Sequence, residues 1–309
     1  MRIILMGTSS WVIPIFDRMA NEHDVVGVFT RAPKPVGRKQ ILTQSPVHIW
    51  AESHNIPVYT KISDFGFLIS DLDKKNHNSE IRNQKSIDAI IVASYGVILK
   101  DNVLNAARLG CINVHPSLLP AYRGPAPMAT SIYNGDTESG ICIMQVTAEV
   151  DAGDIYMCRK FPIGENDTNA DVESRVGNMA AEMLSEFLAA PEKYPPQKQT
   201  GEPTFTRKWT GDDELIDWTR TPREIHNQVR AIGGRTKING LDVKILETRI
   251  NDVGANCIRP TNTVGVCDTP LQITRVQPAG KNPMPWRDFV NGQRGKIEFG
   301  ERPTEKENK

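Results

Sequence analysis

Residues 111–120 read Cys111-Ile-Asn113-Val-His115-Pro116-Ser-Leu-Leu-Pro120, and this stretch decides the fold. Its first half, Cys111 to His115, is expected to form a strand. Pro116 ends that strand, because proline has no N–H to donate to a neighbouring strand. Asn113 and His115 are two positions apart, so in a strand both side chains point to the same face. The stretch therefore predicts a central strand that ends in two neighbouring polar side chains and continues into a stiff loop.

The chain on both sides of this stretch alternates apolar runs with segments of helical spacing. Strands are expected at residues 2–6, 24–30, 56–59, 89–94 and 141–146. Helices are expected at 11–20, from Ser45-Pro46 onward, and at 171–188. This alternation predicts an α/β fold, a Rossmann-like, open and mostly parallel sheet covered on both faces. The carboxyl ends of strands in such a sheet line the ligand crevice, where Asn113 and His115 are expected.

The pattern changes after a segment rich in Pro, Gln and Lys. We expect a first domain at 1–190, an extended linker at 191–205 and a second domain at 206–309. The second domain opens with a helix at Thr221-Pro222. Short strands broken by Gly and Asn then follow, which is typical of a small, OB-like β-barrel. These strands are expected near 236–249, 263–266 and 271–276.

Composition describes an ordinary soluble chain and excludes several classes of protein. The formal net charge is zero, so the overall balance indicates no particular partner. No signal peptide and no apolar stretch of about 20 residues is present, so we expect a cytoplasmic protein with no membrane partner. The five cysteines form no CxxC pair and are expected to be reduced, and histidine spacing suggests no metal. Nothing demands a partner chain, so we expect a monomer.

Asp151 is the third candidate for chemistry. It lies in the turn at 150–154, just after an expected strand, and Gly153 permits a tight backbone there. If the two strand ends are neighbours, Asp151 can orient His115 and raise its pKa, or act as the base itself. An amide beside an imidazole can stabilise an oxyanion on a carbonyl. By themselves, however, a histidine at a strand end and an aspartate in a turn are more often structural.

A basic segment and several missing signatures complete the pattern. Arg31, Lys34, Arg38 and Lys39 place four positive charges within nine residues that contain no acid. Such a run favours contacts with phosphate groups. Without other evidence, however, a basic run is more often simply a solvated loop. Dinucleotide-binding GxGxxG, P-loop and GxSxG signatures are absent.

Four motifs, taken in order, resemble the folate-dependent formyltransferase family. They are Asn113-Val-His115-Pro-Ser-Leu-Leu-Pro120, Tyr122-Arg-Gly124 with Pro127, Asn134-Gly-Asp136, and Val150-Asp151-Ala-Gly-Asp154. The resemblance implies the formyltransferase fold, 10-formyltetrahydrofolate as co-substrate, and Asn113, His115 and Asp151 as the catalytic residues. It also implies a folate pocket lined by Ser117, Leu118, Leu119, Pro120, Tyr95, Gly96, Val97 and Ile98.

Over nearly the whole chain, the sequence is most similar to the members of this family that formylate initiator methionyl-tRNA. The matching C-terminal motifs are Phe205-Thr-Arg-Lys208, Ile216-Asp-Trp218 and Gln277-Pro-Ala-Gly-Lys281. The resemblance implies that the α-amino group of the charged tRNA accepts the formyl group in translation initiation. It also implies that Lys34, Arg38 and Lys39 contact the tRNA.

Three alternatives stay open at this point. Sugar-amine nucleotide N-formyltransferases and the hydrolase part of formyltetrahydrofolate dehydrogenase share the same folate chemistry, and a non-enzymatic RNA-binding protein would also explain the basic segment. One departure from the family is Ile232-Gly-Gly-Arg235, which stands where an aromatic Asn-Pro-Trp-Pro stretch is usual. It leaves domain packing and C-terminal tRNA contacts open, and the residues do not decide whether His115 or Asp151 accepts the proton.

Overall fold

The structure is a computed structural model that describes residues 1–37, 39–75, 86–250, 271–293 and 297–300. Arg38 and the expected strand at 263–266 lie outside these residues. The chain forms two compact units. The first comprises Met1–Pro125, Ser139–Phe161 and Glu173–Thr206, and the second comprises Ala126–Glu138, Pro162–Val172 and Arg207–Lys309. The domain boundaries inferred from the sequence stay a prediction.

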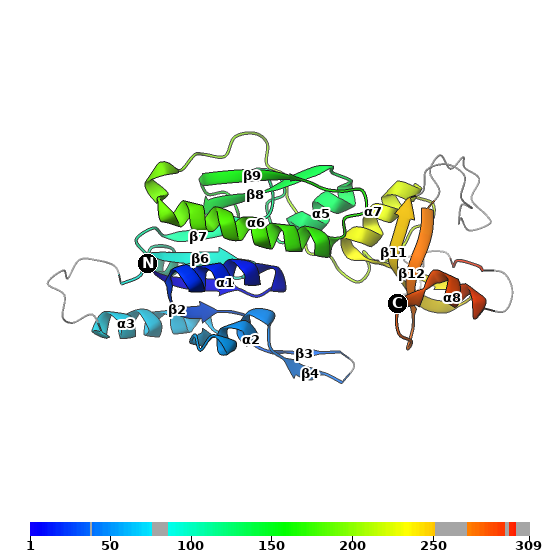
Figure 1. The fold of residues 1–309 in the computed structure, drawn as a ribbon, viewed down its shortest axis with the longest axis horizontal. Helices are drawn as coiled ribbons and strands as arrows, with labels where there is room; N and C mark the ends of the chain where they lie inside the picture. The colour runs from blue at the N-terminus through cyan, green and yellow to red at the C-terminus, as the bar shows by residue number, and fades with distance from the viewer. Residues whose placement is uncertain (38, 76–85, 251–270, 294–296, 301–309) are drawn as a thin grey trace. The chain divides into compact units, whose positions relative to one another are not determined.

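A single seven-stranded sheet organises the first unit (Figure 1). Its order is β5-β2-β1-β6-β7-β8-β9. The strands are β1 (Arg2–Gly7), β2 (Asp24–Phe29), β5 (Val58–Tyr59), β6 (Ala89–Ala93), β7 (Cys111–His115), β8 (Glu138–Gln145) and β9 (Ile155–Pro162). The pairs β1–β2, β1–β6, β2–β5 and β6–β7 are parallel, which confirms the expected α/β sheet.

The strand β8 reverses the direction of the sheet, which the sequence did not indicate. It runs antiparallel to β7, with His115 opposite Cys142 and Ile112 opposite Gln145. The carboxyl end of β8 therefore lies beside the amino end of β7, and the two ends expected to be neighbours are not. Asp151 reaches His115 only because the connection between β8 and β9 folds back toward it.

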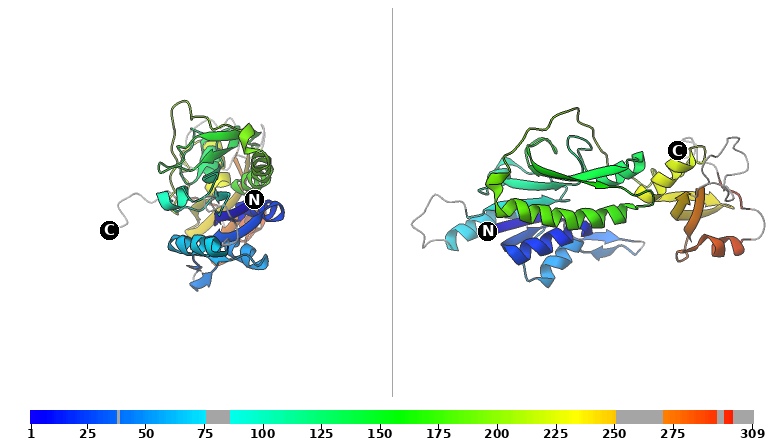
Figure 2. Two further views of the ribbon diagram at one scale, coloured as in Figure 1. Left: turned by 90° about the vertical axis from the view of Figure 1, so that its left-hand side faces the viewer. Right: turned by 45° about the horizontal axis from the view of Figure 1, so that its top comes forward.

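Helices cover both faces of this sheet. Ile4 and Met6 of β1 share a buried cluster with Phe65 and Leu68 of α3 (Phe65–Lys75). The neighbouring residues of β1 point to the opposite face because strand side chains alternate. On that side α1 (Ile13–Glu22) and α6 (Asn169–Ala189) run side by side (Figures 1 and 2). Two smaller helices of this unit are α2 (Pro46–Ser53) and α4 (Asp101–Leu104).

The basic segment forms a β-hairpin rather than an irregular loop. Strands β3 (Lys34–Val36) and β4 (Ile41–Thr43) pair in antiparallel fashion as a separate two-stranded ribbon (Figure 1). The turn between them uses Gly37 at φ 71°, a conformation that favours glycine. The hairpin was missed because these strands are short and exposed on both faces, so no apolar period marks them.

The expected linker is tied to the first unit by specific backbone contacts. Gln197 forms an antiparallel bridge with Ile155, and Phe205 forms a parallel bridge with Arg123. Arg123 N also donates to Thr204 O at 2.8 Å. Residues 197–205 therefore belong structurally to the unit that carries the candidate site.

The cysteine prediction was wrong for one pair. Cys142 of β8 and Cys158 of β9 form a disulfide, with their Cα atoms 4.2 Å apart. The two residues lie 16 positions apart, and only the pairing of these adjacent strands brings them together. Cys111 is free and buried, as expected. Cys257 and Cys267 lie outside the described residues.

The second unit combines an antiparallel sheet with helices and confirms the expected small β domain. Its strands, in the order β10-β11-β12-β13, are β10 (Gly234–Ile238), β11 (Leu241–Ile250), β12 (Leu271–Pro278) and β13 (Met284–Pro285). Its helices are α5 (Pro127–Asn134), α7 (Pro222–Ile232) and α8 (Trp286–Asn291). No helix in the described parts of the chain has the length and apolarity that crossing a membrane requires.

The departure at residues 232–235 makes a very short connection. Helix α7 ends at Ile232, Gly233 adopts φ 88°, and β10 begins at the next residue. A side chain at Gly234 would collide with Ile216 and Val229 of the same core. The two glycines therefore let the chain turn at once from α7 into β10, with Gly234 packed against Val229 of α7.

Helix α7 buries a histidine. His226 Nε2 donates to Glu165 O at 3.0 Å, and its Nδ1 accepts from Thr248 Oγ1 at 2.8 Å. The carbonyl can only accept, so the neutral ring with its proton on Nε2 satisfies both contacts. Burial lowers the pKa of His226, because the charged ring would lose its hydration.

We expect His226 to make the protein sensitive to acid. Its lowered pKa means that the unfolded chain binds more protons below about pH 6.5, so the free energy of unfolding falls as the pH drops. His226→Gln should cost about 1 kcal/mol at pH 7 and flatten the loss of stability between about pH 7 and 5. Urea unfolding at several pH values measures both effects. An equally steep pH dependence in the variant would contradict this prediction.

Candidate active site

The strand β7 presents two polar side chains on one face at its carboxyl end. Asn113 is partly exposed, whereas His115 is only 3% exposed. Ser117 N donates to His115 O at 3.0 Å, so the chain turns immediately after the strand, where Pro116 cannot continue the ladder. Asn113 and His115 therefore lie on one face at the carboxyl end of β7, as their two-residue spacing predicts.

The connection between β8 and β9 carries Asp151 over to this face. Gln145 N donates to Asp154 O at 2.9 Å, which closes the base of the connection. Asp151 itself adopts φ 50°, in the left-handed region that L residues seldom occupy. A Cβ atom at Gly153 would collide with Gln145 O, so this position accepts only glycine without a backbone shift. The turn is therefore tightly constrained around the aspartate.

Asp151 is the centre of the cluster. Its Oδ1 accepts from Asn113 Nδ2 at 3.3 Å, and its Oδ2 lies 3.5 Å from His115 Nδ1. Oδ2 also accepts from the backbone N–H of Gly124 at 2.8 Å. The structure thus brings Asn113, His115 and Asp151 together, and it adds a backbone donor from the turn after β7.

The two ring nitrogens of His115 are both engaged. Its Nε2 lies 3.0 Å from Tyr122 O, which can only accept, so this nitrogen carries a proton. A neutral ring would then turn the lone pair of Nδ1 toward the carboxylate of Asp151. Burial lowers the pKa of His115, while the Asp151 carboxylate and the Tyr122 carbonyl oppose this effect and the Arg123 charge adds to it. The Nδ1 and Oδ2 atoms lie 3.5 Å apart, so Asp151 is close enough to orient the His115 ring and to favour its charged form.

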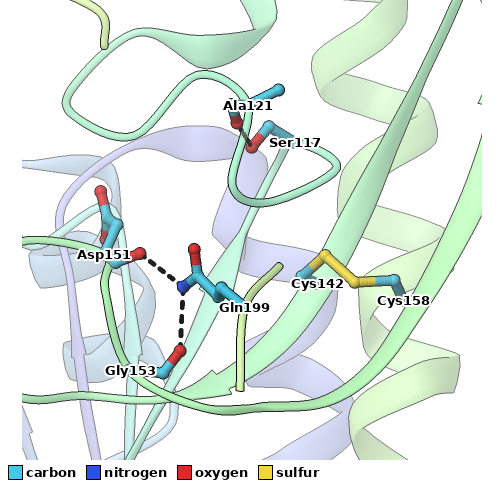
Figure 3. The surroundings of a disulfide bond; sticks show 7 residues. All are labelled: Ser117, Ala121, Cys142, Asp151, Gly153, Cys158 and Gln199. Atoms are coloured by element: carbon cyan, nitrogen blue, oxygen red, sulfur yellow. Dashed lines mark hydrogen bonds between the residues drawn. A yellow bond between two sulfur atoms is a disulfide. The ribbon is translucent and has the colours of Figure 1, made fainter. Parts of the chain in front are cut away.

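The loops expected to line a folate pocket follow two adjacent strands, β6 and β7. After β6, Ser94 and Gly96 have positive φ angles, Tyr95 is buried, and Val97 and Ile98 are 45% and 75% exposed. After β7, Ser117 Oγ donates to Ala121 O at 2.6 Å (Figure 3).

The four residues of the second loop differ in what they do. Ser117 is fully buried, and Leu119 packs against Cys142 and Met144. Leu118 packs against Gly140, so any side chain at position 140 would collide with Leu118. The bond between Leu119 and Pro120 is cis. Lining a pocket stays a prediction for all eight residues.

The predicted tRNA contacts lie on the hairpin. Lys34 and Lys39 are exposed, and Arg38 lies outside the described residues. The hairpin also exposes Val36, Ile41 and Leu42, which are 55%, 62% and 67% exposed. A charged and apolar ribbon of this kind suits a surface that packs against a partner while neutralising phosphates.

Two residues around the cluster carried no predicted role. Arg123 appeared only as part of a motif, yet it is 9% exposed and its guanidinium donates to Gln199 Oε1. Gln199 lies in the segment interpreted as a linker. No local pattern marks it, because its partners come from segments 48 and 76 residues away.

Comparison with known proteins shows the family of the chain. The formyl transferase model matches residues 1–188, and the model of the formyl transferase C-terminal domain matches residues 208–294. The chain therefore belongs to the formyl transferase family. Within it, the chain groups with the methionyl-tRNA formyltransferases, two of which match 96% of its length.

Two relatives and one structure illustrate the likeness. The methionyl-tRNA formyltransferase of Anaplasma marginale is 36% identical over 308 residues, which is 96% of this chain and 97% of the relative. That of Fusobacterium nucleatum is 33% identical over 314 residues, or 96% and 98%. The crystal structure of WlaRD, a sugar 3N-formyl transferase with dTDP and 5-N-formyl-THF, has a TM-score of 0.63, 22% identity, and coverage of 91% of this chain and 99% of WlaRD. This last likeness concerns the fold alone.

Proposed function

We propose that this chain transfers the formyl group of 10-formyltetrahydrofolate to the α-amino group of methionine on initiator tRNA. The observation that carries the proposal is the cluster of Asn113, His115 and Asp151 in a chain that matches methionyl-tRNA formyltransferases over 96% of its length. A sugar amine as acceptor is supported only by a likeness of fold at 22% identity. A purely RNA-binding role would leave the contact between the buried His115 and the partly buried Asp151 without a purpose.

Asn113 is the residue best placed to meet the reacting carbonyl. One N–H of its amide is used on Asp151, and the nitrogen carries a second. Its partial exposure leaves that N–H available to the formyl oxygen, which gains negative charge as the amine adds to the formyl carbon. A donor already fixed by Asp151 needs no reorganisation when this charge develops.

The pair of His115 and Asp151 handles the proton. The attacking amine must lose a proton after it adds, and the folate nitrogen must gain one as it leaves. Asp151 can take the proton from the amine. His115, whose Nδ1 lies 3.5 Å from the carboxylate, can balance the resulting change in charge. In the conformation described here His115 Nε2 donates to Tyr122 O, so direct donation to the formyl oxygen requires the ring to release that carbonyl. Neither a covalent enzyme intermediate nor a metal is needed for these steps.

The surroundings of the cluster complete the proposal. The loops after β6 and β7 would hold the folate, with the exposed Val97 and Ile98 against its pterin ring. The basic hairpin would hold the tRNA. We further propose that the enzyme acts as a monomer in the cytoplasm, where charged initiator tRNA is used.

The hairpin assignment leads to a test on the two described lysines. Replacing Lys34 and Lys39 together by Ala should raise KM for methionyl-tRNA about tenfold and reduce the slope of log KM against log salt by about 1.5. KM for the folate should stay within about twofold, because phosphate neutralisation is not part of folate binding. Lys61→Ala, which removes an exposed lysine elsewhere in the same unit, serves as the control. Equal effects on both substrates would contradict the assignment.

A further inference from the structure

We propose that Gln199 is a positioning residue for the reaction, one that holds the two turns around Asp151 in their catalytic arrangement. The proposal builds on the proposed function and assigns a task to a segment that otherwise looks like a linker. Its basis is the set of four hydrogen bonds that one side chain makes to both turns.

The amide nitrogen of Gln199 makes both of its hydrogen bonds to the turn that carries Asp151. Nε2 donates to Asp151 O at 2.8 Å and to Gly153 O at 2.9 Å (Figure 3). Both N–H groups of the amide are thereby used. They fasten the backbone of the turn at its left-handed residue, Asp151, whose φ of 50° needs support from its surroundings.

The amide oxygen of Gln199 holds the other turn. Oε1 accepts from Arg123 Nε at 3.2 Å and from Arg123 Nη2 at 2.8 Å, a forked contact with a buried guanidinium. The third guanidinium nitrogen, Nη1, lies 3.4 Å from the exposed carboxylate of Glu149. Arg123 is therefore fixed in the main by Gln199.

The neighbours of Arg123 connect this contact to the reacting groups. Tyr122 O accepts from His115 Nε2, and Gly124 N donates to the carboxylate of Asp151. Gln199 thus joins the turn of Asp151 to the segment 122–124, which supplies His115 with its carbonyl partner and Asp151 with its backbone donor. A shift of either turn would change the distance of 3.5 Å between His115 and Asp151.

The backbone on both sides of Gln199 is anchored, so the side chain is delivered to a defined place. Gln197 and Ile155 exchange two backbone hydrogen bonds of 2.7 and 2.9 Å. Beyond Gln199, the backbone carbonyl of Thr204 accepts from Arg123 N at 2.8 Å. The segment 197–204 is therefore held by hydrogen bonds on both sides of Gln199.

Only an amide fits this position chemically. It must donate twice on one atom and accept twice on the other, which no other functional group of this size does. A carboxylate could still accept from Arg123, but it would face the carbonyls of Asp151 and Gly153 with oxygen instead of N–H. Gln199→Glu therefore separates the two halves of the contact while it keeps the shape of the side chain.

The test compares Gln199→Ala, Gln199→Glu and the control Gln197→Ala, which removes an exposed glutamine side chain from the same segment. Both Gln199 variants should lower kcat by about tenfold to a hundredfold, because small displacements of reacting groups are costly, with KM for both substrates within about twofold. The pH profile of kcat should move to lower pH, since a more distant Asp151 leaves His115 with a still lower pKa. The control should match wild type in all three measurements.

Three results would overturn the proposal. They are unchanged kcat and pH profiles in the Gln199 variants, a change confined to KM for methionyl-tRNA, and loss of the fold in both variants as seen by thermal unfolding. Release of the formyl group from the folate is followed alongside transfer. If wild type formylates no methionyl-tRNA, the proposed function fails, and the same comparison of variants on formyl release still decides the role of Gln199.

Discussion

Asp151→Ala is expected to lower kcat for formyl transfer by about a thousandfold, because the carboxylate both handles the proton and organises the cluster. It accepts from Asn113 and from Gly124 N, and it faces His115, so its removal frees three groups at once. Purified variant and wild type are compared by transfer of labelled formyl from the folate to methionyl-tRNA. Turnover near the wild-type rate would remove Asp151 from the mechanism.

Two further variants show which property of Asp151 matters. Asp151→Asn keeps an oxygen for Gly124 N but removes the charge, so an equally large loss assigns the effect to the charge and its proton. Glu149→Gln removes a carboxylate that is 75% exposed two residues away and should behave like wild type. If the asparagine variant were fully active, the carboxylate would serve geometry alone.

Asn113→Ala is expected to lower kcat by about a hundredfold or more, the usual cost of losing one preorganised oxyanion donor. KM for the folate should change little, because the contact strengthens only as charge develops on the formyl oxygen. Initial rates measured over a range of folate concentrations, at saturating methionyl-tRNA, separate kcat from KM for the folate. A rise in KM with unchanged kcat would show that Asn113 binds the substrate instead of stabilising the reacting state.

The companion variants of Asn113 isolate its donor. Asn113→Asp keeps the size of the side chain but offers oxygen to both the substrate and Asp151, so it should be at least as inactive as the alanine variant. Asn178→Ala, which removes an exposed asparagine on α6, controls for general effects of amide removal. An active aspartate variant would contradict a donor role.

Much of the catalytic face follows from local sequence. Asn113 and His115 share a face because the side chains of a strand alternate, and Pro116 marks the strand end, so their arrangement needs no knowledge of the rest of the chain. Asp151 could be proposed from its turn and from the resemblance of the surrounding motifs. The parallel strands β1 and β6 are almost wholly buried apolar runs, the pattern most readily recognised in a sequence.

The parts that escaped prediction depend on pairing between distant segments. The reversed direction of β8 and the disulfide of Cys142 with Cys158 follow from which strands are neighbours, and no local period encodes this. Gln199 lies in a Pro-rich polar stretch whose composition is that of a linker, and only its contacts with Asp151 and Arg123 reveal its place. Sequence patterns describe elements well, whereas such contacts appear only in the folded chain.

The identity of the formyl acceptor is tested most directly by a competition in one reaction. Labelled 10-formyltetrahydrofolate is offered to the wild-type chain together with charged initiator tRNA and a dTDP-linked amino sugar in water, and the label is followed in each product. We expect the label on methionyl-tRNA in at least about hundredfold preference over the sugar and over free formate. Label found mainly on the sugar, or released as formate, would contradict the proposed function.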